Sequence, residues 1–200
     1  MDEENVIYAL YEIGCVKIGN FKLTSGMISP IYIDLRTLPS HPRIFRIIVR
    51  ESINRVISRI DFNVVCGIAT GGIPLATAIA YEMRKPMIYV RKKAKGHGMQ
   101  KLVEGDYKEG VVVLLVDDVA TTGGTLTRTI DILRDEGLIV KDAFVIVDRG
   151  QGAKEKLSEK GVELHYLMTL NEIVEYLNKR SLISREDYLR IIEYLGEANV

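Results

Sequence analysis

The segment that most restricts the fold of this chain is Val111–Val116, six consecutive aliphatic residues near the middle of the sequence. A strand that is apolar at every position has to be buried on both faces, as are the inner strands of a parallel sheet. Shorter apolar runs lie on both sides of it and alternate with stretches of helical spacing. This alternation predicts an α/β fold with a mostly parallel central sheet flanked by helices. Strands are expected at 64–69, 87–90, 111–116, 143–147 and 162–167, and helices at 3–13, 42–60, 73–83 and from 126 to a stop at Gly137, with two more helices ending the chain.

Length and composition place the chain among ordinary globular proteins. Its 200 residues suit one domain, and contents of 47% hydrophobic and 27% charged residues exclude a disordered or low-complexity chain. Lys and Arg together number 27, as do Asp and Glu, so no overall charge draws the chain to nucleic acid or to an anionic membrane. No apolar stretch approaches the roughly 18 residues that a membrane helix needs.

The N-terminus and the cysteines bear on location. Met1–Glu4 is acidic, whereas a secretory signal would be basic. The only cysteines, Cys15 and Cys66, form neither a disulfide framework nor a metal-binding spacing. We therefore expect both to be buried apolar residues of a cytoplasmic protein.

The buried run is followed by two acids and then by a loop of small and hydroxyl-bearing residues. Asp117 and Asp118 come directly after Val116, and the loop continues through Val119, Ala120, Thr121, Thr122, Gly123, Gly124 and Thr125. Backbone N–H groups at a helix start bind anions, and glycines allow a phosphate to approach the backbone closely. The acids suit sugar hydroxyls or a hydrated Mg²⁺ ion. The pattern predicts a phosphate cradle with an adjoining sugar site; the alternative is that the acids only cap a turn.

Two other expected strand ends carry residues suited to ligand binding. In open parallel sheets, ligands bind outside the carboxyl ends of the strands. At Gly67–Gly72, small residues join a strand to a helix, and a second anion would fit there; a tight turn is the alternative. Arg149 follows the strand at 143–147 and could hold a carboxylate through two parallel hydrogen bonds. A surface ion pair is the alternative for Arg149.

The segment from Arg91 to Tyr107 has no periodicity and carries several glycines. Loops of this length inside a compact domain usually have a function. We expect a mobile loop over residues 91–107 that closes on phosphate groups, with His97 in contact with the ligand. A solvated basic loop is the alternative. The cations of this segment are Arg91, Lys92, Lys93, Lys95 and Lys101.

Several of these stretches resemble a known family. Val113–Thr125 resembles the phosphoribosyl diphosphate signature of the type I phosphoribosyltransferases. Phe21–Gly26 followed by Ser29–Asp34 is similar to the N-terminal segment of the orotate phosphoribosyltransferases. Arg91–Gly98 resembles their catalytic loop, and Asp148–Gly150 resembles the segment with their orotate-side arginine. The resemblance implies a type I phosphoribosyltransferase fold in a single domain, residues 1–200, with a small hood formed by residues 1–40 and the C-terminal end.

The resemblance also implies an activity. The 5-phosphoribosyl group would pass from phosphoribosyl diphosphate to orotate, giving orotidine 5′-phosphate and diphosphate in pyrimidine synthesis. Mg²⁺ would bind mainly through the diphosphate, with no metal ligands of the protein's own. A cytoplasmic homodimer that shares the catalytic loop across its interface is implied, with no nucleic acid and no membrane as partner.

The same resemblance assigns roles to residues. The two acids would hold the ribose hydroxyls, the loop after them the 5′-phosphate, and Thr121 with Arg149 the orotate. Arg91, Lys95 and His97 would contact the diphosphate, and Lys92 would reach it from across the dimer interface. The catalytic set is Lys95, His97, Asp117 and Asp118, and the residues expected only to bind substrates are Arg91, Lys92, Val119, Ala120, Thr121, Thr122, Gly123, Gly124, Thr125 and Arg149.

Two positions depart from the pattern of many bacterial members. Those members have a lysine where this chain has Thr24, with Lys22 nearby, and another where it has Gly71. Two other functions stay open. A purine phosphoribosyltransferase would share the phosphate loop but not the Arg91–Gly98 pattern. A regulator that senses phosphoribosyl diphosphate would keep the loop without turnover, but the neutral net charge argues against the nucleic-acid surface it needs.

Overall fold

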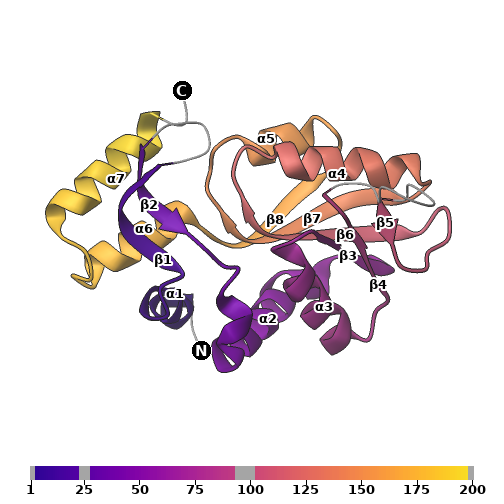
Figure 1. Cartoon of the computed structure of the whole chain (residues 1–200), viewed down its shortest axis with the longest axis horizontal. Helices are drawn as coiled ribbons and strands as arrows, with labels where there is room; N and C mark the ends of the chain where they lie inside the picture. The colour runs from indigo at the N-terminus through magenta and orange to yellow at the C-terminus, as the bar shows by residue number, and fades with distance from the viewer. Residues whose placement is uncertain (1–2, 23–27, 93–101, 198–200) are drawn as a thin grey trace.

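The computed structural model describes residues 3–22, 28–92 and 102–197. Its main body is a six-stranded sheet with strands in the order β5-β4-β3-β6-β7-β8 (Figure 1). Strand β5 pairs antiparallel with β4, and all other pairings are parallel. The mostly parallel sheet predicted from the sequence is therefore confirmed. The strands are β3 (Val64–Ile68), β4 (Met87–Val90), β5 (Val103–Glu104), β6 (Val112–Ala120), β7 (Ile139–Asp148) and β8 (Glu163–Thr169).

Helices cover both faces of this sheet. α2 (Pro42–Arg55) and α3 (Gly72–Met83) lie on one face, and α4 (Gly124–Asp135) and α5 (Ala153–Ser158) lie on the other (Figure 1). Leu114 and Val116 of β6 pack with the first pair of helices, whereas Val113 and Leu115 pack with the second. Each of these four side chains is at most 1% exposed. The strand is apolar from Val112 to Val116 because both of its faces are covered there.

A smaller group of elements lies beside the sheet and forms the hood. The hairpin of β1 (Val16–Lys22) and β2 (Ile28–Ile33) packs with α1 (Glu3–Glu12), α6 (Leu170–Lys179) and α7 (Arg185–Glu197) (Figure 1). The N-terminal and C-terminal elements of the chain therefore both contribute to this group. Its core is continuous with the α2 face of the sheet, since Leu10, Ile31 and Leu170 belong to the same buried cluster as Phe144.

Several elements have other boundaries than the sequence predicts. Strand β7, expected at 143–147, begins at Ile139 because its first residues pair with Val112 and Val113 of β6. The helix expected at 42–60 ends at Arg55, because Val56 leaves the helical conformation at φ −125°; a 3₁₀ turn, Ile57–Arg59, follows. Strand β6 continues past Val116 because its last residues still pair with β7. The short helix α5 was not expected, since six residues are too few to show helical periodicity.

The loop expected at 91–107 also differs in its last part. Val103–Glu104 forms β5 against β4, and the Tyr107 hydroxyl donates a hydrogen bond to Glu136 at 2.7 Å. Burial raises the pKa of Tyr107 to about 12. Residues 102–107 are therefore fixed at the edge of the sheet. None of the described helices is long and apolar enough to cross a bilayer.

Candidate active site

The paired acids lie within the last part of β6, next to the loop that leads into α4. Oδ1 of Asp117 accepts a hydrogen bond from the backbone N–H of Asp118 at 3.0 Å. Oδ1 of Asp118 accepts one from the N–H of Val119 at 2.9 Å. Each carboxylate is thus oriented by the backbone through one oxygen. Because both acids belong to a paired strand, the alternative that they merely cap a turn is wrong.

The electrostatics of this pair are those of a ligand site. Burial raises the pKa of Asp117 well above its ordinary value, and the negative charge of Asp118 raises it further. The ammonium group of Lys92 acts in the opposite direction, so Lys92 lies close enough to interact with Asp117. Two adjoining carboxylates with one strongly perturbed pKa are more frequent at functional sites than elsewhere.

The turn after β3 packs directly against these acids. A Cβ atom on Gly72 would lie 2.5 Å from the carbonyl oxygen of Val116, and a Cβ atom on Gly71 would meet the carboxylate of Asp118. Only residues without side chains permit this approach. The two strand ends that the sequence singled out, after β3 and after β6, therefore lie side by side. Close backbone contact, in addition to a tight turn, explains the glycines.

The loop after β6 lines a cavity of about 320 Å³. Gly123, at φ +75°, turns the chain into α4. The Thr127 hydroxyl donates to the carbonyl oxygen of Gly123 at 3.1 Å, whereas the N–H groups of the first helical turn have no acceptor within the helix. An anion here would meet these donors and the positive end of the helix dipole. The lining comes from one short segment, Asp117 together with Val119, Ala120, Thr121, Thr122, Gly123, Gly124, Thr125 and Leu126.

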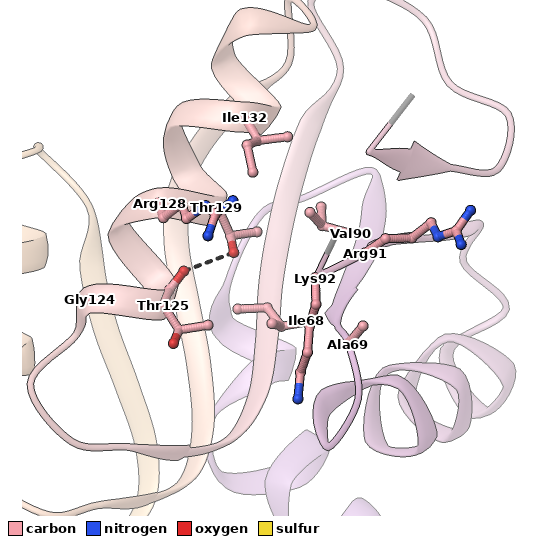
Figure 2. Close-up of a pocket in the computed structure, with 10 residues that line it drawn as sticks. All are labelled: Ile68, Ala69, Val90, Arg91, Lys92, Gly124, Thr125, Arg128, Thr129 and Ile132. Carbon is pink, nitrogen blue, oxygen red and sulfur yellow. Dashed lines mark hydrogen bonds between the residues drawn. The ribbon is translucent and has the colours of Figure 1, made fainter. Parts of the chain in front are cut away.

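A second cavity, of about 380 Å³, lies between the ends of β3 and β4 and the first turns of α4 (Figure 2). Lys92 extends into it beside Ile68 and Ala69 (Figure 2). Gly124 and Thr125 line both cavities, so this cation adjoins the phosphate loop. Within the single chain, Lys92 thus faces the phosphate loop of its own subunit, and its expected contact across a dimer interface stays a prediction.

Arg91 takes a different direction from Lys92. Its side chain points away from α4 (Figure 2), and its Nη1 atom forms an ion pair with Glu104 of β5 at 3.1 Å. The guanidinium is thus not directed at the phosphate loop. The contact between Arg91 and the diphosphate stays a prediction.

Arg149 directly follows β7 and is tied to the phosphate loop, because its backbone N–H donates to the carbonyl oxygen of Ala120 at 3.0 Å. The residue is only 8% exposed, and burial lowers its pKa. Its Nε atom donates to Gln151 at 3.1 Å, but Nη2 is buried without a hydrogen-bond partner in the described parts of the chain. A surface ion pair is therefore wrong for Arg149, and a buried guanidinium with a free donor indicates an anion site.

The remaining predicted residues fall into two groups. Thr121 and Thr122 are exposed at the rim of the cradle, where their hydroxyls are accessible. Lys95, His97 and Thr24 lie outside the described residues, so their roles stay predictions. Lys22 is exposed at the end of β1.

Sequence reasoning missed two cations at this edge of the sheet. Arg128 lines the cavity that holds Lys92, and its position one helical turn after Thr125 was a usable signal. Arg36 of the hood pairs with Asp34 at 2.7 Å. Asp34 raises the pKa of Arg36 and Asp118 adds to the effect, so the hood approaches the paired acids. No local pattern marks Arg36, because its position depends on the packing of the hood.

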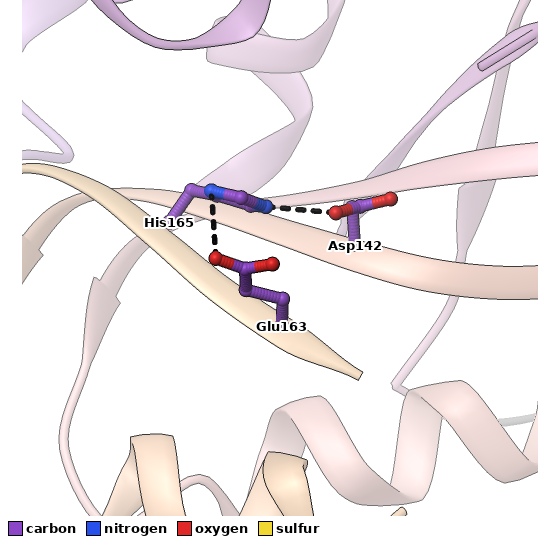
Figure 3. A group of neighbouring side chains, drawn as sticks. All are labelled: Asp142, Glu163 and His165. Carbon is purple, nitrogen blue, oxygen red and sulfur yellow. Dashed lines mark hydrogen bonds and ion pairs between the residues drawn. The ribbon is translucent and has the colours of Figure 1, made fainter. Parts of the chain in front are cut away.

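A separate group of titratable side chains lies near the amino ends of β7 and β8 (Figure 3). Asp142 and Glu163 are cross-strand neighbours, and His165, two residues further along β8, shares their face. Nε2 of His165 lies 2.7 Å from Asp142, and Nδ1 lies 3.9 Å from Glu163. Because the phosphate loop follows the carboxyl ends of the strands, this group is not part of the candidate active site.

Comparison with known proteins agrees with this geometry. Residues 37–165 match the phosphoribosyl transferase domain family. An orotate phosphoribosyltransferase of Sulfurisphaera tokodaii is 49% identical over 189 residues, which cover 94% of this chain and 96% of that protein.

Solved structures of related proteins share the fold. The structure of Leishmania donovani UMP synthase matches with a TM-score of 0.90 and 35% identity, over 98% of this chain and 43% of that chain. Orotate phosphoribosyltransferase from Aeropyrum pernix matches with a TM-score of 0.79 and 38% identity, over 90% of this chain and 99% of that chain. A buried arginine lies beside a phosphate cradle, and relatives match this chain over nearly its whole length. The chain therefore belongs to the orotate phosphoribosyltransferase family.

Proposed function

We propose that this orotate phosphoribosyltransferase transfers the 5-phosphoribosyl group of phosphoribosyl diphosphate to orotate, a step of pyrimidine nucleotide synthesis. The position of Arg149 carries the proposal. Its guanidinium is buried with Nη2 unpaired among the described residues, and its backbone is bonded to Ala120 in the phosphate loop. A cation that suits a carboxylate thus adjoins a cradle that suits a phosphate. These are the anionic groups of orotate and of the sugar donor.

The sugar donor would lie along the carboxyl edge of the sheet. The N–H groups of Thr121–Thr125 and the threonine hydroxyls at the rim would bind its 5′-phosphate. Asp117 and Asp118 would accept hydrogen bonds from the ribose hydroxyls. Such bonds favour a charged carboxylate and would offset the burial that raises the pKa of Asp117.

Mg²⁺ fits this site as an ion held mainly through the substrate. It retains several waters and typically binds through one or two carboxylates together with substrate phosphates. Asp117 and Asp118 offer two carboxylates with no further His, Cys or acidic ligand grouped with them; the one such group found in the described residues is that of Asp142. When bound, Mg²⁺ would neutralise charge on the diphosphate.

The reaction breaks the bond between C1 of the ribose and the diphosphate oxygen and joins C1 to N1 of orotate. The bonding electron pair leaves with the diphosphate, C1 gains cationic character, and the N1 proton is released. Fixed cations that face the leaving group stabilise this separation of charge. We assign this role to Lys92, which extends into the cavity beside Thr125, and to Lys95 and His97 on the basis of the sequence. Orotate already carries a negative charge, so no strong base is required.

We also propose a homodimer in which the loop after Lys92 contributes to the site of the partner subunit, as the family resemblance implies. A cytoplasmic location is proposed too. It is supported by Cys15 and Cys66, which are unpaired and buried. Burial raises the pKa of both thiols, which keeps them neutral.

An absorbance assay with a panel of bases tests the activity. The purified chain, Mg²⁺ and phosphoribosyl diphosphate are mixed with orotate, uracil, adenine or hypoxanthine, and the ultraviolet spectrum is followed. Turnover is expected with orotate alone, and chelation of Mg²⁺ by EDTA should stop it. Turnover with a purine would instead identify a purine enzyme, and tight donor binding without any turnover would identify a regulator.

A further inference from the structure

The starting observation is a pair of buried donors that lack partners. Nη2 of Arg149 and the hydroxyl of Tyr194 are both inaccessible to solvent, and apart from each other neither has a hydrogen-bond partner in the described parts of the chain. Native proteins leave few buried polar atoms unsatisfied, so each exception requires an explanation. Arg149 comes from the end of β7 and Tyr194 from α7, so the two donors come from the sheet and from the hood.

The two groups are neighbours. The hydroxyl of Tyr194 lies close enough to the guanidinium of Arg149 to oppose the effect of burial on its pKa. Tyr194 packs against the same buried cluster as Val147, two residues before Arg149. It also lines a cavity of about 260 Å³ between the β1–β2 hairpin and α7. Tyr194 thus borders this cavity and also interacts with the buried guanidinium.

Polar contacts of Arg190 hold α7 in this position. Arg190 lies one helical turn before Tyr194 and lines the same cavity. Its Nη1 atom donates to Asn20 of β1 at 3.1 Å, and Nη2 donates to Asp187 at 2.9 Å. The Tyr194 ring is therefore carried by a helix that is bonded to the hairpin, which limits how far the hydroxyl can move from Arg149.

A guanidinium N–H and a phenolic O–H are both donors, and the acceptor that satisfies two neighbouring donors at once is a carboxylate. We propose that Tyr194 is a further substrate-binding residue, whose hydroxyl holds the carboxylate of orotate together with Arg149. This inference rests on the proposed function and extends it, because it gives the C-terminal helix a direct part in the choice of base. A base without the carboxylate would leave both buried donors without this acceptor, and such sites discriminate strongly against the smaller analogue.

Steady-state kinetics of Tyr194→Phe test the inference. Loss of a hydrogen bond to a charged group is expected to raise the KM for orotate about tenfold. The KM for phosphoribosyl diphosphate, kcat and the inhibition constant of uracil should stay within about twofold of wild type, since none of them involves the carboxylate. Tyr188→Phe on the same helix is the matched control, because Tyr188 stacks on Arg185 and lines a different cavity.

A double-mutant cycle separates direct binding from a structural effect. If both groups hold one carboxylate, adding Tyr194→Phe to Arg149→Ala should raise the KM for orotate much less than it does alone. Unchanged orotate kinetics in Tyr194→Phe, or equal losses for orotate, uracil and the sugar donor, would overturn the inference. Wild-type protein without orotate turnover would refute the proposed function itself. A defective Arg149→Ala beside a normal Tyr194→Phe would refute only the role of Tyr194.

Discussion

A Cβ atom at position 71 would lie 2.5 Å from Oδ2 of Asp118, so glycine at this position lets the turn after β3 rest on the paired acids. Many bacterial members have a lysine at this position. In this chain a side chain there would push the Asp118 carboxylate aside. Gly71 and Asp118 are therefore matched, and the shape of the donor site depends on both.

Gly71→Ala is expected to weaken binding of phosphoribosyl diphosphate by about 3–10-fold while sparing the fold, since the added methyl displaces only the end of a flexible side chain. Calorimetric titration with Mg²⁺ present measures the affinity, and thermal unfolding measures the stability. Gly196→Ala is the control, because a Cβ atom there meets nothing within 4 Å. Unaltered donor affinity in Gly71→Ala would show that Asp118 can move without consequence.

Gly72→Ala, unlike Gly71→Ala, should destabilise the fold. Its methyl group would lie 2.5 Å from the Val116 carbonyl oxygen, and backbone cannot yield as a side chain does. Overpacking of this kind typically destabilises a protein by about 1–3 kcal/mol. Denaturant unfolding should report this loss for Gly72→Ala but not for Gly71→Ala, and equal stabilities of the two variants would contradict the packing described for the turn.

Asp117→Asn is expected to raise the melting temperature at pH 7 by at least about 2 °C, while weakening donor binding. The pKa of Asp117 is raised in the folded protein, so the folded state binds its proton more tightly than the unfolded state does. Asp117 therefore adds to the free energy of unfolding below its ordinary pKa of 3.8. This contribution is lost as the pH rises through the raised pKa of the folded state. Asparagine does not titrate, so the variant should not lose stability in this way at pH 7.

The pH dependence provides the check. The difference in melting temperature between Asp117→Asn and wild type should be largest near pH 7 and should shrink as the pH falls toward 4. A variant that melts below wild type at pH 7 would mean that the charge of Asp117 is stabilised in the free protein. Burial would then not be the dominant influence on the Asp117 carboxylate.

Much of the sheet could be predicted because its strands are marked locally. The aliphatic run of β6 and the turns after β3 and β6 carry their signals within a few residues. The extent of β6 could not be read in this way, since Asp117 and Ala120 remain in the strand only through pairing with Val145 and Asp148. Strand β5 depends likewise on β4, because two residues have no periodicity of their own.

The residues of the candidate site likewise fall into those marked by a local sequence pattern and those placed by tertiary packing. Asp117, Asp118 and the phosphate loop were recognisable because one short segment holds all of them. Arg36 and Tyr194 were not, because each comes to the site through the hood, whose hairpin and C-terminal helices are distant in sequence. The direction of Arg91 was also beyond prediction, since its partner Glu104 belongs to a strand that the sequence did not reveal.

The proposed homodimer predicts complementation between two inactive variants. Lys95→Ala should lose activity mainly in kcat, because its charge matters most as the diphosphate departs. Arg149→Ala disables the other part of the site. If the loop acts across the interface, random subunit exchange between the variants should restore about one quarter of wild-type activity, because half of the dimers are mixed and each has one intact site. Verified exchange without any recovery would exclude a shared loop.

In the proposed reaction, the buried guanidinium of Arg149 recognises the carboxylate of orotate beside a phosphate cradle. Steady-state kinetics of Arg149→Ala, with both substrates varied, test it most directly. The KM for orotate should rise by roughly 100-fold, since two charge-assisted hydrogen bonds are lost. The KM for phosphoribosyl diphosphate should stay within about twofold of wild type, and Arg149→Lys should recover only part of the orotate affinity, because lysine lacks the paired donors. An unchanged KM for orotate in Arg149→Ala would show that Arg149 does not hold the carboxylate.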